Sequence, residues 1–248
     1  MREAKLDASA ANLQGSSREE IAEWSTQRLC TWMGPVAVVL SLLGMVIIGG
    51  YIPATDPAAG AAEIARFYTE NLASVRLGMI VSMIGFTLFI PFGIAIAMQT
   101  RRMEAVPVMT YVQIAAVAVA ALEGVISTCI WLAAAFRPDE INPEITRALH
   151  DLGWIVFLVD VPPFSVWMVA IGIAILRDHH PKPLFPRWLG FFNFWVALLI
   201  LPALLLPFFK TGPFAYNGIL ALYLPFGAFF IWMVVMTIGL LQALGSKR

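Results

Sequence analysis

Residues 152–176 read LGWIVFLVDVPPFSVWMVAIGIAIL, an apolar run that contains one ionisable residue, Asp160. A helix rises about 1.5 Å per residue, so this run is long enough to cross the roughly 30 Å hydrocarbon layer of a bilayer. Its composition excludes a solvent-exposed helix, and its length exceeds that of an ordinary core strand. The run therefore predicts a transmembrane helix.

Five further runs have the same length and character, at 33–52, 77–98, 107–136, 188–209 and 217–244. The chain has 248 residues, of which 60% are hydrophobic and 13% charged, against roughly 45–50% and 25% in a soluble domain. We therefore expect an all-α polytopic bundle of six transmembrane helices. We divide the chain into a partly disordered cytoplasmic segment, 1–30, and the six-helix domain, 31–248.

The distribution of basic residues predicts the orientation of this bundle. Eleven of the 16 Lys and Arg residues fall in the N-terminal segment, in the loops after the second and fourth runs, and at the C-terminus. The five on the other side are Arg66, Arg76, Arg137, Arg147 and Lys210. Because cytoplasmic loops carry the excess of Lys and Arg, both termini should be cytoplasmic. The basic and acidic residues balance at 16 each, which disfavours nucleic-acid binding.

The loops on the expected outer side contain helical signals. In DPAAGAAEIARFYTENLASVR, residues 56–76, apolar residues recur among charges at near-helical spacing, which predicts a helix on the membrane surface. Asn142 followed by Pro143 predicts the start of the fourth helix in the aqueous phase, with Arg147 and Asp151 paired one turn apart. We expect Trp131 and Trp154 at the outer membrane interface.

Two acids, Glu123 and Asp160, are the acidic residues that this topology cannot place in water. A charged group at the bilayer centre costs about 2.5–3.5 kcal/mol on insertion scales, so it requires a partner or a function. No Lys or Arg lies in the apolar runs to neutralise either acid, so the neutral, protonated form is expected. Each acid is a candidate substrate-binding or proton-coupling group; the alternative is a hydrogen bond between helices.

Asp160 carries a second signal, because Pro162 and Pro163 follow it. The two prolines remove two backbone donors and predict a broken helix at membrane depth. Such a break beside an acid is frequent at substrate and ion sites of transporters. A proline kink with Asp160 bonded to a neighbouring helix is the alternative.

Three further polar residues are candidates for the same site: Asn193, Tyr223 and, at the outer mouth, His150. Each of them alone is more often a packing residue than a ligand contact. Prolines at 91, 202, 207 and 225 predict further kinks and an enclosed cavity. With 17 Phe and 8 Trp in the chain, such a cavity would be aromatic and suited to a hydrophobic guest.

Several classes of chemistry lack their residues. Three histidines are too few for a membrane iron enzyme with histidine clusters, and the apolar runs lack a histidine pair for haem. Asp178, His179 and His180 are better interpreted as a solvated loop than as a metal site. There is no Walker, dinucleotide-binding or G-x-S-x-G motif. We therefore expect no cofactor and no metal.

The stretch LFPRWLGFFNFWVALLILPALLLPFFKTGPFAYNGI, residues 184–219, with RLGMI at 76–80 and LHDLGW at 149–154, resembles a group of small bacterial integral membrane proteins. That group is common in mycobacteria and related hydrocarbon-using or sterol-using bacteria. The resemblance covers all six runs. It implies a six-helix topology in the bacterial cytoplasmic (inner) membrane and no particular activity or catalytic residues.

Three functions remain open at this point. The favoured one is binding or transport of a hydrophobic small molecule through a cavity that contains Asp160 and Glu123. The second is a membrane enzyme that uses a neutral carboxylic acid as general acid on a lipid-like substrate. The third is a non-catalytic accessory subunit. The expected partners are the lipid bilayer and a hydrophobic small molecule; a homo-oligomer or a membrane complex stays open.

Overall fold

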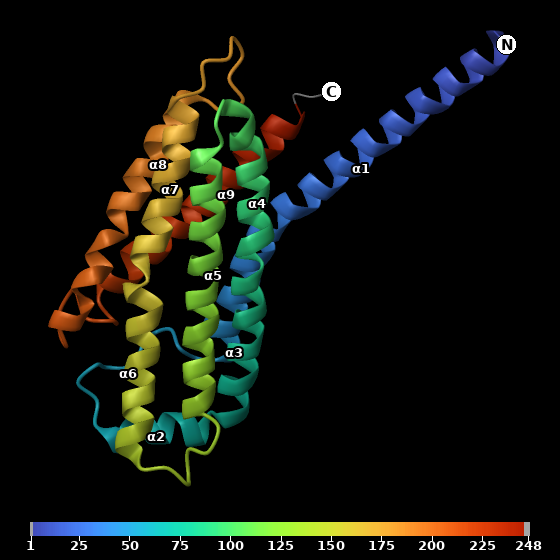
Figure 1. The fold of residues 1–248 in the computed structure, drawn as a ribbon. Coiled ribbons are helices and arrows are strands. Elements are labelled where there is room, and N and C mark those ends of the chain that lie inside the picture. The colour runs from blue at the N-terminus through green and yellow to red at the C-terminus, as the bar shows by residue number, and fades with distance from the viewer. Residues whose placement is uncertain (1, 246–248) are drawn as a thin grey trace.

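The chain folds into a bundle of helices, shown in Figure 1. The computed structural model describes the backbone of residues 2–245 and the side chains of residues 22–245. Its main helices are α1 (Arg2–Leu42), α2 (Ala61–Glu70), α3 (Leu72–Thr87), α4 (Phe89–Thr100), α5 (Val108–Ala134), α6 (Pro143–Val159), α7 (Val161–Leu176), α8 (Arg187–Leu199) and α9 (Leu224–Gly245). Residues 2–30 belong to α1, and our expectation that the segment 1–30 is partly disordered stays a prediction.

Six helical segments of the described chain are long and apolar enough to cross a membrane, which confirms the predicted number. They are Ala22–Ile48, Leu72–Met103, Val108–Ala134, Pro143–Leu176, Arg187–Phe208 and Ile219–Gly245. Several extend beyond the predicted ranges because the helix continues past the apolar run into polar residues. The protein is thus suited to a bilayer as a multi-pass membrane protein.

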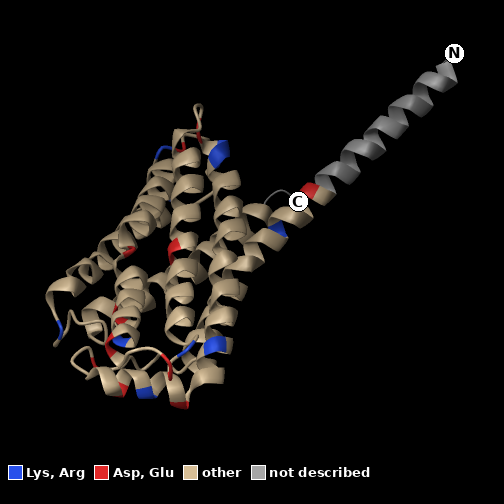
Figure 2. Cartoon of the chain, turned by 60° about the horizontal axis from the view of Figure 1, so that its bottom comes forward, with Lys and Arg blue, Asp and Glu red and all other residues tan. Residues whose placement is uncertain are grey.

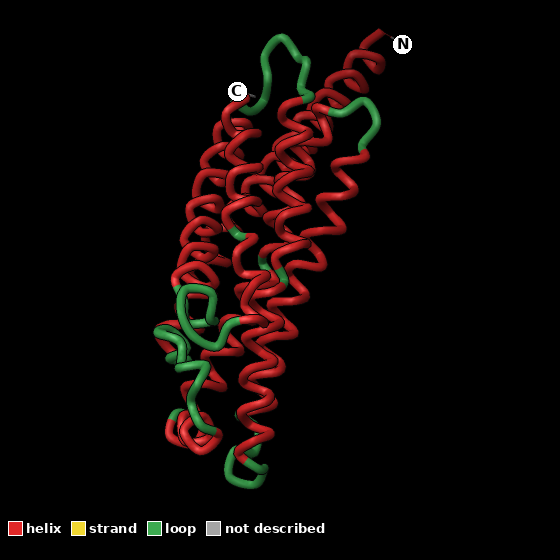
Figure 3. The backbone as a smooth tube through the Cα atoms, turned by 90° about the vertical axis from the view of Figure 1, so that its left-hand side faces the viewer, coloured by secondary structure: helices red, strands yellow, loops and turns green. Residues whose placement is uncertain are grey.

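The two termini of the chain lie at the same end of the bundle (Figure 3). We call this the terminal end; the loops around α2 and before α6 form the opposite end (Figure 1). Figure 2, in which basic residues are blue and acidic residues red, shows most of them near these two ends and a few acidic residues between the ends. Which end faces the cytoplasm stays a prediction.

The helices are irregular where the sequence places prolines. Leu88 separates α3 from α4, three residues before Pro91. A 3₁₀ segment, η3 (Leu201–Phe208), contains Pro202 and Pro207, and a π-helical segment, η4 (Ile219–Tyr223), ends just before Pro225. Regular α-helical geometry is thus interrupted near each of these prolines, because proline cannot donate to the carbonyl one turn earlier.

Close packing of small residues joins the end of α1 to α3. The π-helical segment η1 (Leu43–Ile48) continues α1 and contains Gly44. A Cβ atom at Gly44 would lie 2.4 Å from the carbonyl oxygen of Gly78 on α3, and one at Gly78 would lie 2.5 Å from the carbonyl oxygen of Gly44. The two backbones touch here, an approach that small residues permit between membrane helices.

The loops at the opposite end confirm two predictions and correct a third. The helix expected within 56–76 is α2, which is strongly amphipathic and buries Ile64 and Tyr68. The Asn142 side chain accepts a hydrogen bond from the backbone N–H of Glu144, as an N-cap does. The predicted contact of Arg147 with Asp151 is replaced by one with Glu144, whose carboxylate lies 2.6 Å from the guanidinium, although the Arg147 charge still acts on Asp151.

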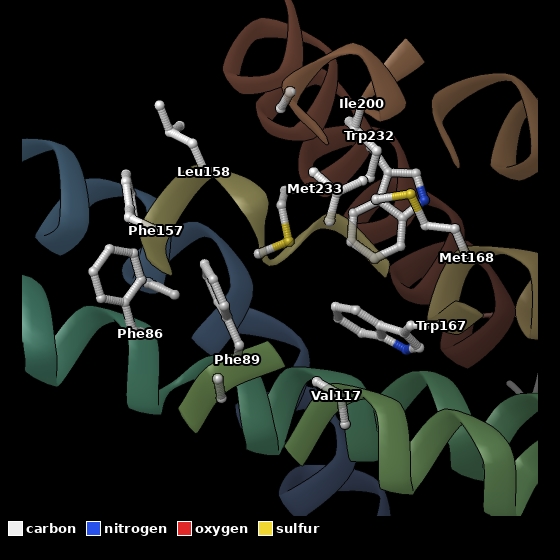
Figure 4. Packing of buried hydrophobic residues seen from close by; sticks show 14 of the residues in the cluster. Phe86, Phe89, Val117, Phe157, Leu158, Trp167, Met168, Ile200, Trp232 and Met233 are labelled. Atoms are coloured by element: carbon white, nitrogen blue, oxygen red, sulfur yellow. The ribbon is translucent and has the colours of Figure 1, made fainter. Parts of the chain in front are cut away.

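Aromatic residues fill much of the core (Figure 4). Trp131 and Trp154 are fully buried, so the prediction that they anchor the bundle at the membrane interface was wrong. Their rings pack edge to face with centroids 5.2 Å apart. Each indole N–H also finds an acceptor on His150. Burial with a satisfied N–H is favourable for tryptophan, and this explains their place in the core.

Candidate functional site

The helix that contains Asp160 is broken at that residue. α6 ends at Val159 and α7 begins at Val161, with Pro162 and Pro163 in its first turn. Asp160 lies between the two helices with φ −71° and ψ 13°, and its side chain does not cap α7. The predicted break is therefore present. Two prolines in the first helical turn are tolerated because the N–H groups they lack would have no intrahelical acceptor there.

An apolar cavity borders this break. The centre of a water-sized sphere can move through about 90 Å³ of this cavity. A single bound water needs roughly 10–15 Å³ of such volume, so the cavity can hold more than one water. Its walls come from α1, η1, α3, α4, α5, α6, α7, α9 and the residues before η3. Seven of the lining residues are phenylalanines: Phe86, Phe89, Phe157, Phe164, Phe226, Phe229 and Phe230. Figure 4 shows Phe86, Phe89 and Phe157 close together on facing helices.

Two polar residues line this cavity, Asp160 and Ser41. The Ser41 side chain is buried, and within the described chain its hydroxyl has no hydrogen-bond partner. Asp160 is half-buried, and no described Lys, Arg or His side chain forms an ion pair with it. A buried polar group normally finds a partner, so the Ser41 hydroxyl is left with an unused hydrogen-bonding capacity at the cavity wall.

Glu123 lies beside this cavity without lining it. Its neighbours on α5, Ala120 and Gly124, are lining residues. One carboxylate oxygen of Glu123 is buried and has no hydrogen-bond partner among the described residues. The acid is close enough to Asp160 to interact with it electrostatically. The structure thus brings the two predicted acids into one region, but only Asp160 borders the cavity.

His150 is not at the mouth of this cavity. It is 1% exposed and lies in the core at the opposite end of the bundle. Its Nε2 atom is 2.8 Å from the Thr55 hydroxyl and its Nδ1 atom is 2.9 Å from the Tyr68 hydroxyl. Our placement of His150 at the outer mouth was wrong, because the loop containing Thr55 and helix α2 cover it.

Tyrosines extend this hydrogen-bonded cluster. Tyr51 donates to the Tyr68 hydroxyl across 3.0 Å, and the Tyr216 hydroxyl lies 3.3 Å from that of Thr55. Burial raises the pKa of Tyr51 and Tyr68, and burial raises that of Tyr216 to about 12. The cluster ties three separate segments, 51–68, α6 and the loop before η4, into one body.

The other two candidates lie away from the cavity. Asn193 is fully buried on α8, where its amide accepts from the Trp232 indole at 2.8 Å and donates to the Leu189 carbonyl. It is already satisfied within the protein, which fits a packing role. Tyr223 is 42% exposed at the end of η4. Neither residue lines the cavity that Asp160 borders.

The loop after α7 is organised by Asp178. Its carboxylate accepts from the backbone N–H and Nδ1 of His180 and from the backbone N–H of Leu184. Burial acts to raise the pKa of Asp178, but these hydrogen bonds outweigh it and hold the pKa below its usual value. Among the described side chains, no three His, Cys, Asp or Glu lie close enough to hold a metal ion.

Sequence reasoning missed Ser41 and the tyrosine cluster. Ser41 stands in an apolar run with no local signal that its hydroxyl is unpartnered. Tyr51 and Tyr68 are 17 residues apart, and both lie far along the chain from His150. The segment LHDLGW contains two residues of the cluster, His150 and Trp154, but in the sequence it supported only the family resemblance.

Comparison with known proteins adds no family to this description. No protein-family model matches the chain, and neither a curated protein nor a solved structure matches it. Function must therefore be argued from the site itself.

Proposed function

We propose that this protein binds or transports a hydrophobic small molecule within the membrane, with Asp160 as the polar contact in the cavity. The observation that carries the proposal is the cavity itself: an aromatic wall interrupted by an unpaired carboxyl group at a broken helix. Ligand sites are typically apolar with a few polar groups that fix orientation, and this cavity has that composition.

The helices on either side suggest how a guest enters. At the terminal end, α1 and α9 are held together by the Trp24 indole, which donates to the Leu244 carbonyl at 3.3 Å. Further from that end the two helices diverge (Figure 1). Lining residues Leu42 of α1 and Phe226 of α9 are half-buried there. We propose that a guest enters between them from the lipid.

The experiment is identification of co-purifying small molecules by mass spectrometry. The test variant is Ala120→Leu, which adds bulk to a buried residue of the cavity wall. Ala133→Leu makes the same change at an exposed position of the same helix, α5. A guest that is present in the wild type and in Ala133→Leu, but depleted in Ala120→Leu, supports the proposal. Equal recovery from all three proteins contradicts it.

A further inference from the structure

The cavity contains a single ionisable side chain, that of Asp160, among its lining residues. Its carboxyl group has no cationic partner within residues 22–245. Another acid, Glu123, interacts with it electrostatically. The ionisable groups at the cavity are therefore both acids, and a cationic guest would supply the partner that lets the Asp160 carboxyl group ionise.

The wall of the cavity also favours a positively charged guest. Seven phenylalanines line it, and the face of an aromatic ring attracts a cation through its quadrupole. Aromatic side chains around a site suit ammonium groups that carry apolar substituents. A neutral guest without a hydrogen-bond donor would gain nothing from an ionised Asp160, and an anion would be repelled by it.

Ser41 adds an independent observation. Its side chain is 5% exposed, lines the cavity and has no hydrogen-bond partner among the described residues. A hydroxyl oxygen can accept a hydrogen bond from an N–H group. Ser41 and Asp160 thus offer acceptors to the head of a guest, while the phenylalanines surround its apolar part.

We propose that the cavity recognises a lipophilic monovalent cation, such as an ammonium group with apolar substituents. This inference rests on the proposed function and narrows it to one charge class. The cation places its positive charge against the Asp160 carboxylate and its apolar surface against the rings. The limited free volume of the cavity restricts the guest to a small aromatic or branched cation.

The test uses three probes of similar shape: phenyltrimethylammonium, its neutral isostere tert-butylbenzene, and the anion benzenesulfonate. Binding to the full chain in phosphatidylcholine nanodiscs is measured by equilibrium dialysis against empty nanodiscs. We expect the cation to bind at least about tenfold more tightly than the neutral isostere, and the anion not to bind.

Three variants locate this preference. Asp160→Asn should abolish it, whereas Asp160→Glu should retain it because the charge is kept. Asp139→Asn makes the same carboxyl-to-amide change at an exposed turn and should leave the preference unchanged.

Two outcomes separate the inference from the proposed function. Equal binding of the cation and its neutral isostere to the wild type would overturn the cation inference and leave a hydrophobic guest in place. If no probe binds above empty nanodiscs, the proposed function fails together with the inference. The wild-type comparison decides this even where Asp160→Asn does not fold.

Discussion

The indole N–H of Trp154 donates to Nε2 of His150, one turn earlier on α6, across 3.1 Å. Because an indole nitrogen can only donate, Nε2 must be the unprotonated acceptor. The imidazole is therefore neutral, with its proton on Nδ1, and this N–H donates to the Tyr68 hydroxyl. The hydroxyl of Thr55 then also donates to Nε2. In a charged imidazolium Nε2 also carries a proton, so its N–H would face the N–H of Trp154 and neither would have an acceptor.

Loss of the imidazole should destabilise the opposite end of the bundle. His150→Phe keeps an aromatic ring but leaves the buried Trp154 N–H and the Thr55 hydroxyl without their acceptor. Each orphaned group costs about 1–3 kcal/mol, so we expect a loss of about 2–4 kcal/mol. The measurement is denaturant unfolding in detergent. His179→Phe, at an exposed position, should change little; equal losses in both variants would contradict the assigned network.

Alkaline pH should weaken the same end. Burial raises the pKa of Tyr216 from 10.0 to about 12, and its ring stacks on Trp154 with centroids 5.2 Å apart. Between these two pH values the unfolded tyrosine releases its proton while the folded one retains it. Stability is therefore fully present below about pH 10 and falls as the pH rises toward about 12.

Unfolding measured across this range should show a smaller decline for Tyr216→Phe than for the wild type, since phenylalanine does not ionise. Part of the decline should remain, because burial also raises the pKa of Tyr68. Identical pH profiles for the two proteins would mean that Tyr216 is not held in its neutral form.

Gly78→Ala should be strongly destabilising. The added Cβ would lie 2.5 Å from the Gly44 carbonyl oxygen and 2.6 Å from Gly49 Cα, both backbone atoms that cannot move alone. We expect at least about 2 kcal/mol, as for overpacked cores. Gly227→Ala is the matched control on α9, where nothing lies within 4 Å of the new Cβ. It should be neutral or stabilising by up to about 1 kcal/mol. Similar thermal unfolding of the two variants would refute the backbone contact.

Replacing Asp160 by leucine should stabilise the protein while removing its polar contact for a guest. The carboxyl group is unpaired in an apolar cavity, so an apolar side chain suits the empty protein better, by about 1–3 kcal/mol. Asn193→Leu should do the reverse, because the Trp232 indole and the Leu189 carbonyl lose their partner. Thermal unfolding of both variants in detergent distinguishes a ligand contact from a packing residue. Destabilisation by Asp160→Leu would assign Asp160 to packing.

The six spans and the break at Asp160 could be predicted because each depends on local sequence. An apolar run of sufficient length has few alternatives to a membrane helix, and Pro162 and Pro163 cannot continue one. The Asn142 cap was equally local. These features need no knowledge of which helices are neighbours.

The candidate site could be predicted only in part, since its geometry depends on long-range packing. The Asp160 acid was visible, but the sequence does not say which seven of 17 phenylalanines face it. His150 follows a polar helix start and therefore resembled a surface residue. Its burial depends on Thr55, Tyr68 and Tyr216, which come from segments far apart in the chain.

The phenylalanine wall around Asp160 has an electrical consequence. Apolar side chains make up most of the cavity wall and disfavour a continuous column of water, so this cavity is better suited to holding a guest than to conducting ions or protons. A carboxylate together with one monovalent cation carries no net charge. A guest held at Asp160 would thus reside in the low-dielectric layer as part of a neutral pair, and the membrane around it would stay an insulator.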